Sequence, residues 1–74
     1  SIKMEAKIIE ILKNVCETQN VNAESNQSNT ENWDSLHQLN LVVELEDAFN
    51  VSLEPEEIAE MTSVANIIKV LSTK

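Results

Sequence analysis

The chain of 74 residues has no glycine and no arginine, and it contains a single cysteine and a single proline. The absence of glycine excludes the glycine-rich loop that forms the oxyanion hole of many serine hydrolases. One cysteine cannot form an internal disulfide, which suits a reducing compartment, so we expect a cytoplasmic protein. No secretory segment is recognisable, and no apolar run approaches the roughly 20 residues that a membrane span needs.

Basic residues are also few, because five lysines stand against 13 acidic residues and give a formal net charge of −8 at pH 7. Such a polyanion repels phosphate backbones, so the charge excludes nucleic acid as a partner and disfavours anionic membrane surfaces. Basic patches on other proteins are the natural target of these acids, in encounters that depend on salt. The acids could alternatively serve only to keep a small protein in solution.

The first half of the chain predicts one helix and one long loop. Apolar residues recur at three- and four-residue steps over residues 2–16, which indicates an amphipathic helix. Within it, Cys16 is expected to be a half-buried, unreactive thiol. Residues 18–34 lose this pattern and are rich in Asn, Ser and Thr, which is typical of a loop. Val21 and Ala23 could pin this loop to the core, and Trp33 could anchor its end.

The second half predicts three more helices. A helix over Ser35 to Phe49 ends at Asn50, which tolerates the left-handed conformation usually taken by glycine. Pro55, inside an acidic run, indicates the start of a short third helix that ends by Met61. Thr62 and Ser63 then cap a fourth helix, whose apolar residues follow helical spacing: Val64, Ile67, Ile68 and Leu71.

These elements predict an all-α fold in a single domain over residues 1–74. We expect a four-helix bundle of three longer helices and a short third helix, with a long loop between the first two. The small core leaves little room for a deep catalytic cleft, which favours a binding or carrier role.

The second predicted helix carries two apolar stripes when its residues are placed at about 100° each. The expected core face has four members, with Phe49 as the only expected core aromatic: Leu41, Val42, Leu45 and Phe49. The second stripe lies well over 90° away: Leu36, Leu39 and Val43. It is flanked by Asn40, Glu46 and Asp47. This stripe is either a docking surface for a partner with a basic rim, or it is covered by residues 18–34 or by the third helix.

The start of this helix is open to two interpretations. Ser35 and Gln38 fit a capping box, in which the hydroxyl accepts a backbone N–H and Gln38 reaches back. Asp34 could equally be the cap, which would leave the Ser35 hydroxyl free for chemistry. Asp34, Ser35 and His37 are also the residue types of a hydrolase triad. However, neighbouring helical residues do not face each other, so we predict no catalytic residue. We expect His37, the only histidine, to be a solvated surface residue.

The loop contains oxygen-bearing side chains at spacings reminiscent of a calcium-binding loop. They are Asn20, Asn22, Glu24, Asn26 and Glu31. Ser25 stands where the sharp turn of such a loop needs glycine, and the first ligand would be an asparagine, so we predict no metal site.

The residues around the second helix resemble the acyl carrier protein family. Trp33-Asp34-Ser35-Leu36 opens that helix, and Pro-Glu-Glu and Thr-Ser-Val follow in order, so the resemblance runs from the first helix to the last. It implies that Ser35 carries a covalent 4′-phosphopantetheine arm, placed there from coenzyme A by a phosphopantetheinyl transferase. The chain would then be a monomeric, non-catalytic carrier of acyl thioesters, and Asp34 would help to position the site.

The resemblance also implies that the second helix docks partner enzymes, which would be acyl-transferring and chain-modifying enzymes with basic patches. Its contacts would be Leu36, Leu39, Val43, Glu46 and Asp47. Carriers from fatty acid synthesis usually have acids where His37 and Asn40 stand. The pathway could therefore be fatty acid or polyketide synthesis, or another dedicated pathway.

Three alternatives differ from this interpretation. A peptidyl carrier usually has a glycine-rich run before the serine, which Glu31-Asn32-Trp33 does not supply. A D-alanyl or other specialised aminoacyl carrier shares the Asp-Ser pair but generally has methionine where Leu36 stands. An unmodified acidic helical adaptor would bind its partner without any covalent change at Ser35.

Overall fold

Four helices make up the fold in a computed structural model that describes residues 2–74. They are α1 (Ile2–Cys16), α2 (Ser35–Phe49), α3 (Pro55–Glu60) and α4 (Val64–Leu71). One isolated bridge joins Asn26 to Ser63, and residues 2–74 contain no other β structure. The predicted all-α, four-helix architecture is confirmed, although α4 with 8 residues is closer in length to α3 with 6 than to the two 15-residue helices.

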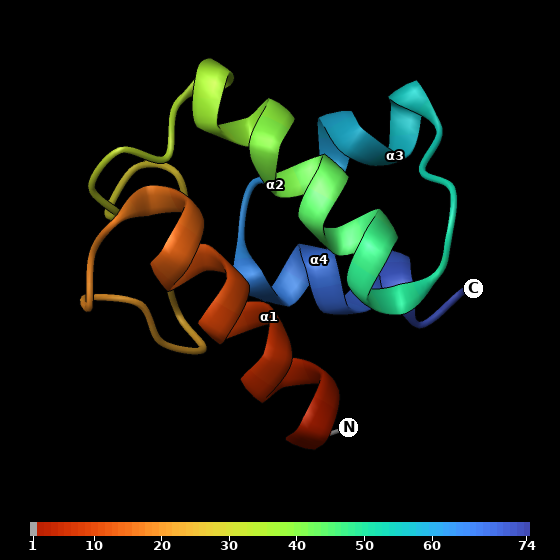
Figure 1. The fold of residues 1–74 in the computed structure, drawn as a ribbon, viewed down its shortest axis with the longest axis horizontal. Coiled ribbons are helices and arrows are strands. Elements are labelled where there is room, and N and C mark those ends of the chain that lie inside the picture. The colour runs from red at the N-terminus through yellow and green to blue at the C-terminus, as the bar shows by residue number, and fades with distance from the viewer. Residues whose placement is uncertain (1) are drawn as a thin grey trace.

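Helices α1, α2 and α4 surround the core, and α3 lies against α4. Figure 1 shows the long loop between α1 and α2 on the left of the molecule, with both ends of the chain on the right. Most of the largest fully buried side chains are aliphatic: Ile8, Leu12, Leu41, Leu45, Met61, Ile67 and Val64. None of the helices in the described part of the chain combines the length and apolar character needed to cross a bilayer.

The helix ends follow the signals in the sequence. Asn50 ends α2 with φ 54° and ψ 52°, the left-handed conformation predicted for it, and its N–H donates to the Glu46 carbonyl. Pro55 opens α3, and the carboxylate of Glu57 accepts from the backbone N–H of Glu54 at 2.8 Å. The Ser63 hydroxyl accepts from the N–H of Asn66 at 3.0 Å and caps α4.

The long loop is attached to the core partly through its backbone. Val21 is buried, as predicted, and Trp33 at the loop end is buried too, but the prediction for Ala23 is wrong because its side chain is exposed. Ser25 is buried instead, and its carbonyl accepts from the N–H of Val64 at 3.0 Å. Hydrogen bonds between main chains need no apolar side chain, so the periodicity of the sequence gave no sign of this attachment.

Two predictions about the core are wrong. Cys16 is fully buried, not half-buried, and burial raises the pKa of its thiol, which therefore stays neutral. Phe49 is only partly buried because it is the last residue of α2, whereas Trp33 from the loop is 4 % exposed. The loop thus supplies the buried aromatic residue of the core.

Leucines on opposite sides of α2 provide a test of this packing. Leu45 is fully buried, whereas the side chain of Leu39 is 65 % exposed. We expect Leu45→Ala to lower the free energy of unfolding by about 2–5 kcal/mol, because it leaves a cavity in the core. The matched Leu39→Ala should change it by less than about 0.5 kcal/mol. Urea denaturation measures both, and equal losses would contradict the orientation of α2.

Candidate functional site

Asp34 caps the N-terminus of α2 and leaves Ser35 as the first helical residue. The Asp34 backbone is extended, and its Oδ1 accepts from the N–H of His37 at 2.9 Å. The Ser35 side chain is exposed, and its hydroxyl makes no hydrogen bond within residues 2–74. Of the two interpretations of this helix start, the capping box between Ser35 and Gln38 is therefore wrong, and the cap at Asp34 is confirmed.

The ring of His37 contacts the Asp34 carboxylate that caps α2. Its Nδ1 lies 2.7 Å from Asp34 Oδ1, and the His37 side chain is 25 % exposed. His37 is therefore at the surface, as predicted, but it is only partly solvated because it contacts Asp34. The backbone N–H of His37, followed by its ring, lowers the pKa of Asp34 below the ordinary value. A triad histidine binds the acid through one ring nitrogen and the serine through the other. His37 makes the contact with Asp34, but no hydrogen bond joins its ring to the Ser35 hydroxyl within residues 2–74.

Trp33 and Gln38 fix the segment that precedes Ser35. The indole Nε1 of Trp33 donates to Gln38 Oε1 at 2.7 Å. Gln38 Nε2 in turn donates to the carbonyls of Met61 at 3.1 Å and Ile58 at 3.4 Å. Gln38 is thus not part of a capping box. It joins Trp33, at the end of the loop, to the C-terminal end of α3. Sequence reasoning missed this role, because these partners are 20 and 23 residues away.

The second apolar stripe of α2 is open to solvent. Leu36, Leu39 and Val43 are 68 %, 65 % and 62 % exposed. The alternative in which residues 18–34 or the third helix cover this stripe is therefore wrong. Apolar side chains grouped on one exposed helix face are a typical docking surface.

The polar residues flanking the stripe differ in their exposure and in their hydrogen bonds. Asn40 and Asp47 are exposed. Glu46 is partly buried, and its Oε2 accepts from the N–H of Leu53 at 2.9 Å. One oxygen of Glu46 therefore holds the connection between α2 and α3, a use that the helical wheel did not indicate.

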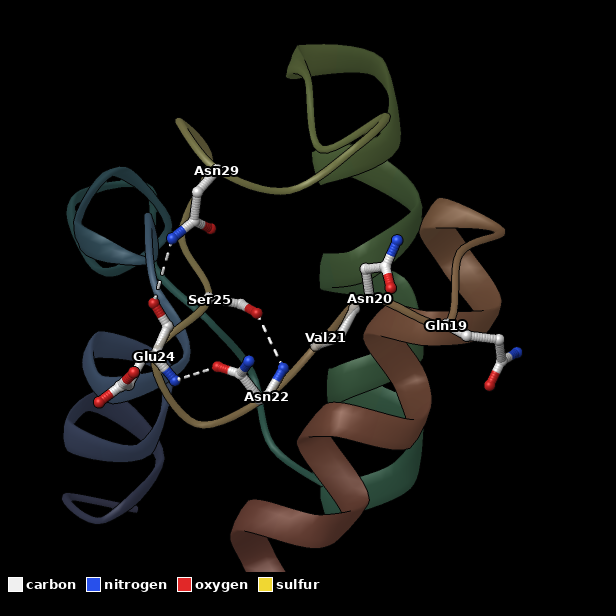
Figure 2. Close-up of a pocket in the computed structure, with 7 residues that line it drawn as sticks. All are labelled: Gln19, Asn20, Val21, Asn22, Glu24, Ser25 and Asn29. Atoms are coloured by element: carbon white, nitrogen blue, oxygen red, sulfur yellow. Dashed lines mark hydrogen bonds between the residues drawn. The ribbon is translucent and has the colours of Figure 1, made fainter.

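A polar hollow lies within the long loop, with a volume of about 420 Å³. Figure 2 shows that Asn22, Glu24, Ser25 and Asn29 hydrogen-bond to one another around it, whereas Gln19 extends away from them. Three side-chain oxygens of the calcium-like pattern accept hydrogen bonds from within the loop: Asn22 Oδ1, Asn26 Oδ1 and Glu31 Oε1. Among residues 2–74, no group of three or more His, Cys, Asp or Glu side chains could hold a metal ion.

A second hollow of about 460 Å³ lies on the surface between the end of α1 and the first half of α2. Its lining is mostly polar: Asn14, Val15, Glu17, His37, Asn40 and Glu44. This polar lining offers little apolar surface to an alkyl chain.

The pairing of Asp34 with His37 predicts a measurable titration. Because the pKa of Asp34 is lowered in the folded state, its stabilising effect is complete above about pH 4 and is lost as the pH falls through the folded-state value. In His37→Ala we expect this pKa to rise but to stay below the ordinary value, since the backbone N–H of residue 37 remains. Carboxyl chemical shifts measured by NMR test this. An unchanged pKa would show that the ring contributes nothing.

Comparisons with known proteins agree with the four-helix fold. The solved structure of a protein from Mycobacterium tuberculosis, assigned as an acyl carrier protein, matches with a TM-score of 0.82 at 21 % identity. The match covers 95 % of this chain and 96 % of the other. No curated protein sequence matches this chain. The family model for the phosphopantetheine attachment site matches residues 6–71. The chain therefore belongs to the family of carrier domains to which 4′-phosphopantetheine is covalently attached.

Proposed function

We propose that this chain is a non-catalytic acyl carrier, with 4′-phosphopantetheine attached to Ser35. The observation that supports this most directly is the exposed Ser35 hydroxyl at the first position of α2, while the neighbouring Asp34 caps the helix. A serine that served as the cap would have its oxygen engaged with a backbone N–H. Here the hydroxyl is open to an incoming transferase.

The start of α2 suits a phosphodiester. The first backbone N–H groups of a helix have no partner within the helix, and the dipole of a 15-residue helix places partial positive charge there. The negative charge of Asp34 would repel the phosphate, but Asp34 Oδ1 already accepts the backbone N–H of His37 and contacts its ring. When attached, the arm supplies a terminal thiol on which acyl groups are carried as thioesters.

The base for the loading reaction belongs to the partner in this proposal. His37 is the nearest candidate in sequence, but it is bound to Asp34 and makes no hydrogen bond to the Ser35 hydroxyl. A base of the phosphopantetheinyl transferase would accept the hydroxyl proton. The Ser35 oxygen would bond to the phosphorus next to the pantetheine of coenzyme A, the pyrophosphate linkage would break, and adenosine 3′,5′-bisphosphate would leave, with magnesium bound to the phosphates. Asp34 Oδ2 makes no hydrogen bond within residues 2–74, so it can meet a cationic group of that enzyme.

The exposed stripe beside Ser35 is the proposed docking surface for this transferase and for acyl-handling enzymes. Leu36, Leu39 and Val43 would make the apolar contacts, and Asp47 and the free oxygen of Glu46 would face a basic rim. The net charge of −8 would speed and orient such encounters. A carrier must leave each enzyme after transfer, and a narrow stripe on one helix is compatible with weak, brief binding.

Loading of Ser35 is tested by intact mass. Incubation with coenzyme A, magnesium and a broad-specificity phosphopantetheinyl transferase should add one phosphopantetheinyl group to the protein. Ser35→Ala should abolish the gain, because it removes the oxygen that forms the new bond. Ser52→Ala, a change at another exposed serine, should be loaded like the parent protein. An unchanged parent mass would favour the unmodified adaptor.

The docking role of the stripe predicts a kinetic change. Leu39→Ala should raise the KM of the transferase for this protein about fivefold, which corresponds to roughly 1 kcal/mol of lost contact. The matched control Ile2→Ala removes another exposed aliphatic side chain, which is 89 % exposed on α1, and should leave KM unchanged. Steady-state loading measures both. Equal KM values for the two variants would argue against docking at the stripe.

A further inference from the structure

Helix α3 is weakly held by apolar packing. It spans only Pro55–Glu60, and none of its residues is buried. Polar contacts hold it to α4 and the chain end, through Asn66 Nδ2 to the Glu60 carbonyl at 2.9 Å and Lys74 to Glu57 at 2.8 Å. A short helix attached in this way is expected to open locally at a lower free energy than the core helices.

In the described part of the chain, one side chain of α2 makes the hydrogen bonds to α3 and to Met61, the residue that caps the C-terminus of α3. Gln38 Nε2 donates to the carbonyls of Ile58 and Met61, while Gln38 Oε1 accepts from the indole N–H of Trp33. An indole N–H can only donate and a carbonyl can only accept, so these partners fix which way the amide points. The two ends of the amide belong to one planar group. A rotation that improves one contact therefore weakens the other.

We propose that Gln38 couples the segment bearing Ser35 to α3, so that displacement of Trp33 releases α3. Trp33 is 4 % exposed and lies two residues before Ser35, yet its hydrogen bonds are to Gln38 and Thr30 and none reaches α3. Any partner that moves Trp33 removes the indole N–H from Gln38 Oε1. The side-chain amide of Gln38 is then free to rotate. The carbonyls of Ile58 and Met61 then lose this donor, and α3 keeps its polar contacts with α4 and the chain end and the packing of the partly buried Ile58 against the core. This coupling does not require that Ser35 be modified.

Two variants test separately the contact of Gln38 with Trp33 and its contacts with Ile58 and Met61, and a third variant is the control. Gln38→Glu keeps an acceptor for the indole N–H but cannot donate to the carbonyls of α3. Trp33→Phe removes the indole N–H and leaves the amide of Gln38 in place. Gln19→Glu is the matched control, since it makes the same chemical change on an exposed loop side chain that points away from its neighbours (Figure 2).

Amide hydrogen exchange, followed by NMR, measures how often α3 opens in each variant. The amides of Ile58 and Met61 report on α3, and the amide of the fully buried Leu12 in α1 is the reference for global unfolding. Relative to Leu12, we expect exchange in α3 to rise about three- to tenfold in both Gln38→Glu and Trp33→Phe, the range set by the loss of one hydrogen bond. The indole N–H should stay hydrogen-bonded in Gln38→Glu and so stay protected from exchange, and Gln19→Glu should match the parent.

The outcome for Trp33→Phe is decisive. If its exchange in α3 equals that of Gln19→Glu, then Trp33 and α3 are independent and the proposal is overturned. Unchanged exchange in Gln38→Glu would overturn it equally, because the donors of Gln38 would then contribute nothing to α3. Both measurements use the unloaded protein. Their failure is therefore distinct from a failure of Ser35 to accept the arm.

Discussion

The burial of Leu41 and Leu45 fixes the rotation of α2, and the rest of the structure depends on that rotation. Both leucines are fully buried in the core, where α2 packs against α1. A helix that buries one stripe must present the opposite side to solvent, so Leu36, Leu39 and Val43 are left exposed. A different rotation would bury these residues and expose the core leucines. The candidate docking surface is therefore a consequence of core packing.

Competition for the free N–H groups at the start of α2 determines what Ser35 can do. Asp34 and Ser35 are both good caps, and only one of them can occupy that position. Asp34 takes it and is held there by the backbone and the ring of His37. Gln38, which a capping box would need, is engaged with Trp33 and the carbonyls of α3. These contacts of Asp34 and Gln38 thus leave the serine hydroxyl unengaged.

The comparisons and the geometry support different parts of the functional conclusion. The likeness to the mycobacterial structure, at 21 % identity, shows the fold alone. The family model over residues 6–71 establishes the attachment chemistry. The geometry at the start of α2 supports Ser35 as the residue that is modified. The exposed stripe supports the proposed docking of protein partners.

The sequence by itself determined the four helices, their ends and the two stripes of α2, because helical periodicity and capping are local properties that neighbouring residues fix. Only the tertiary structure decided that Asp34 is the cap, that Cys16 and Trp33 are buried, and that Ala23 is exposed. The same holds for Gln38, whose partners on α3 are 20 and 23 residues away. Such choices depend on which segments meet in space. Local patterns can state the alternatives, and contacts between distant segments select among them.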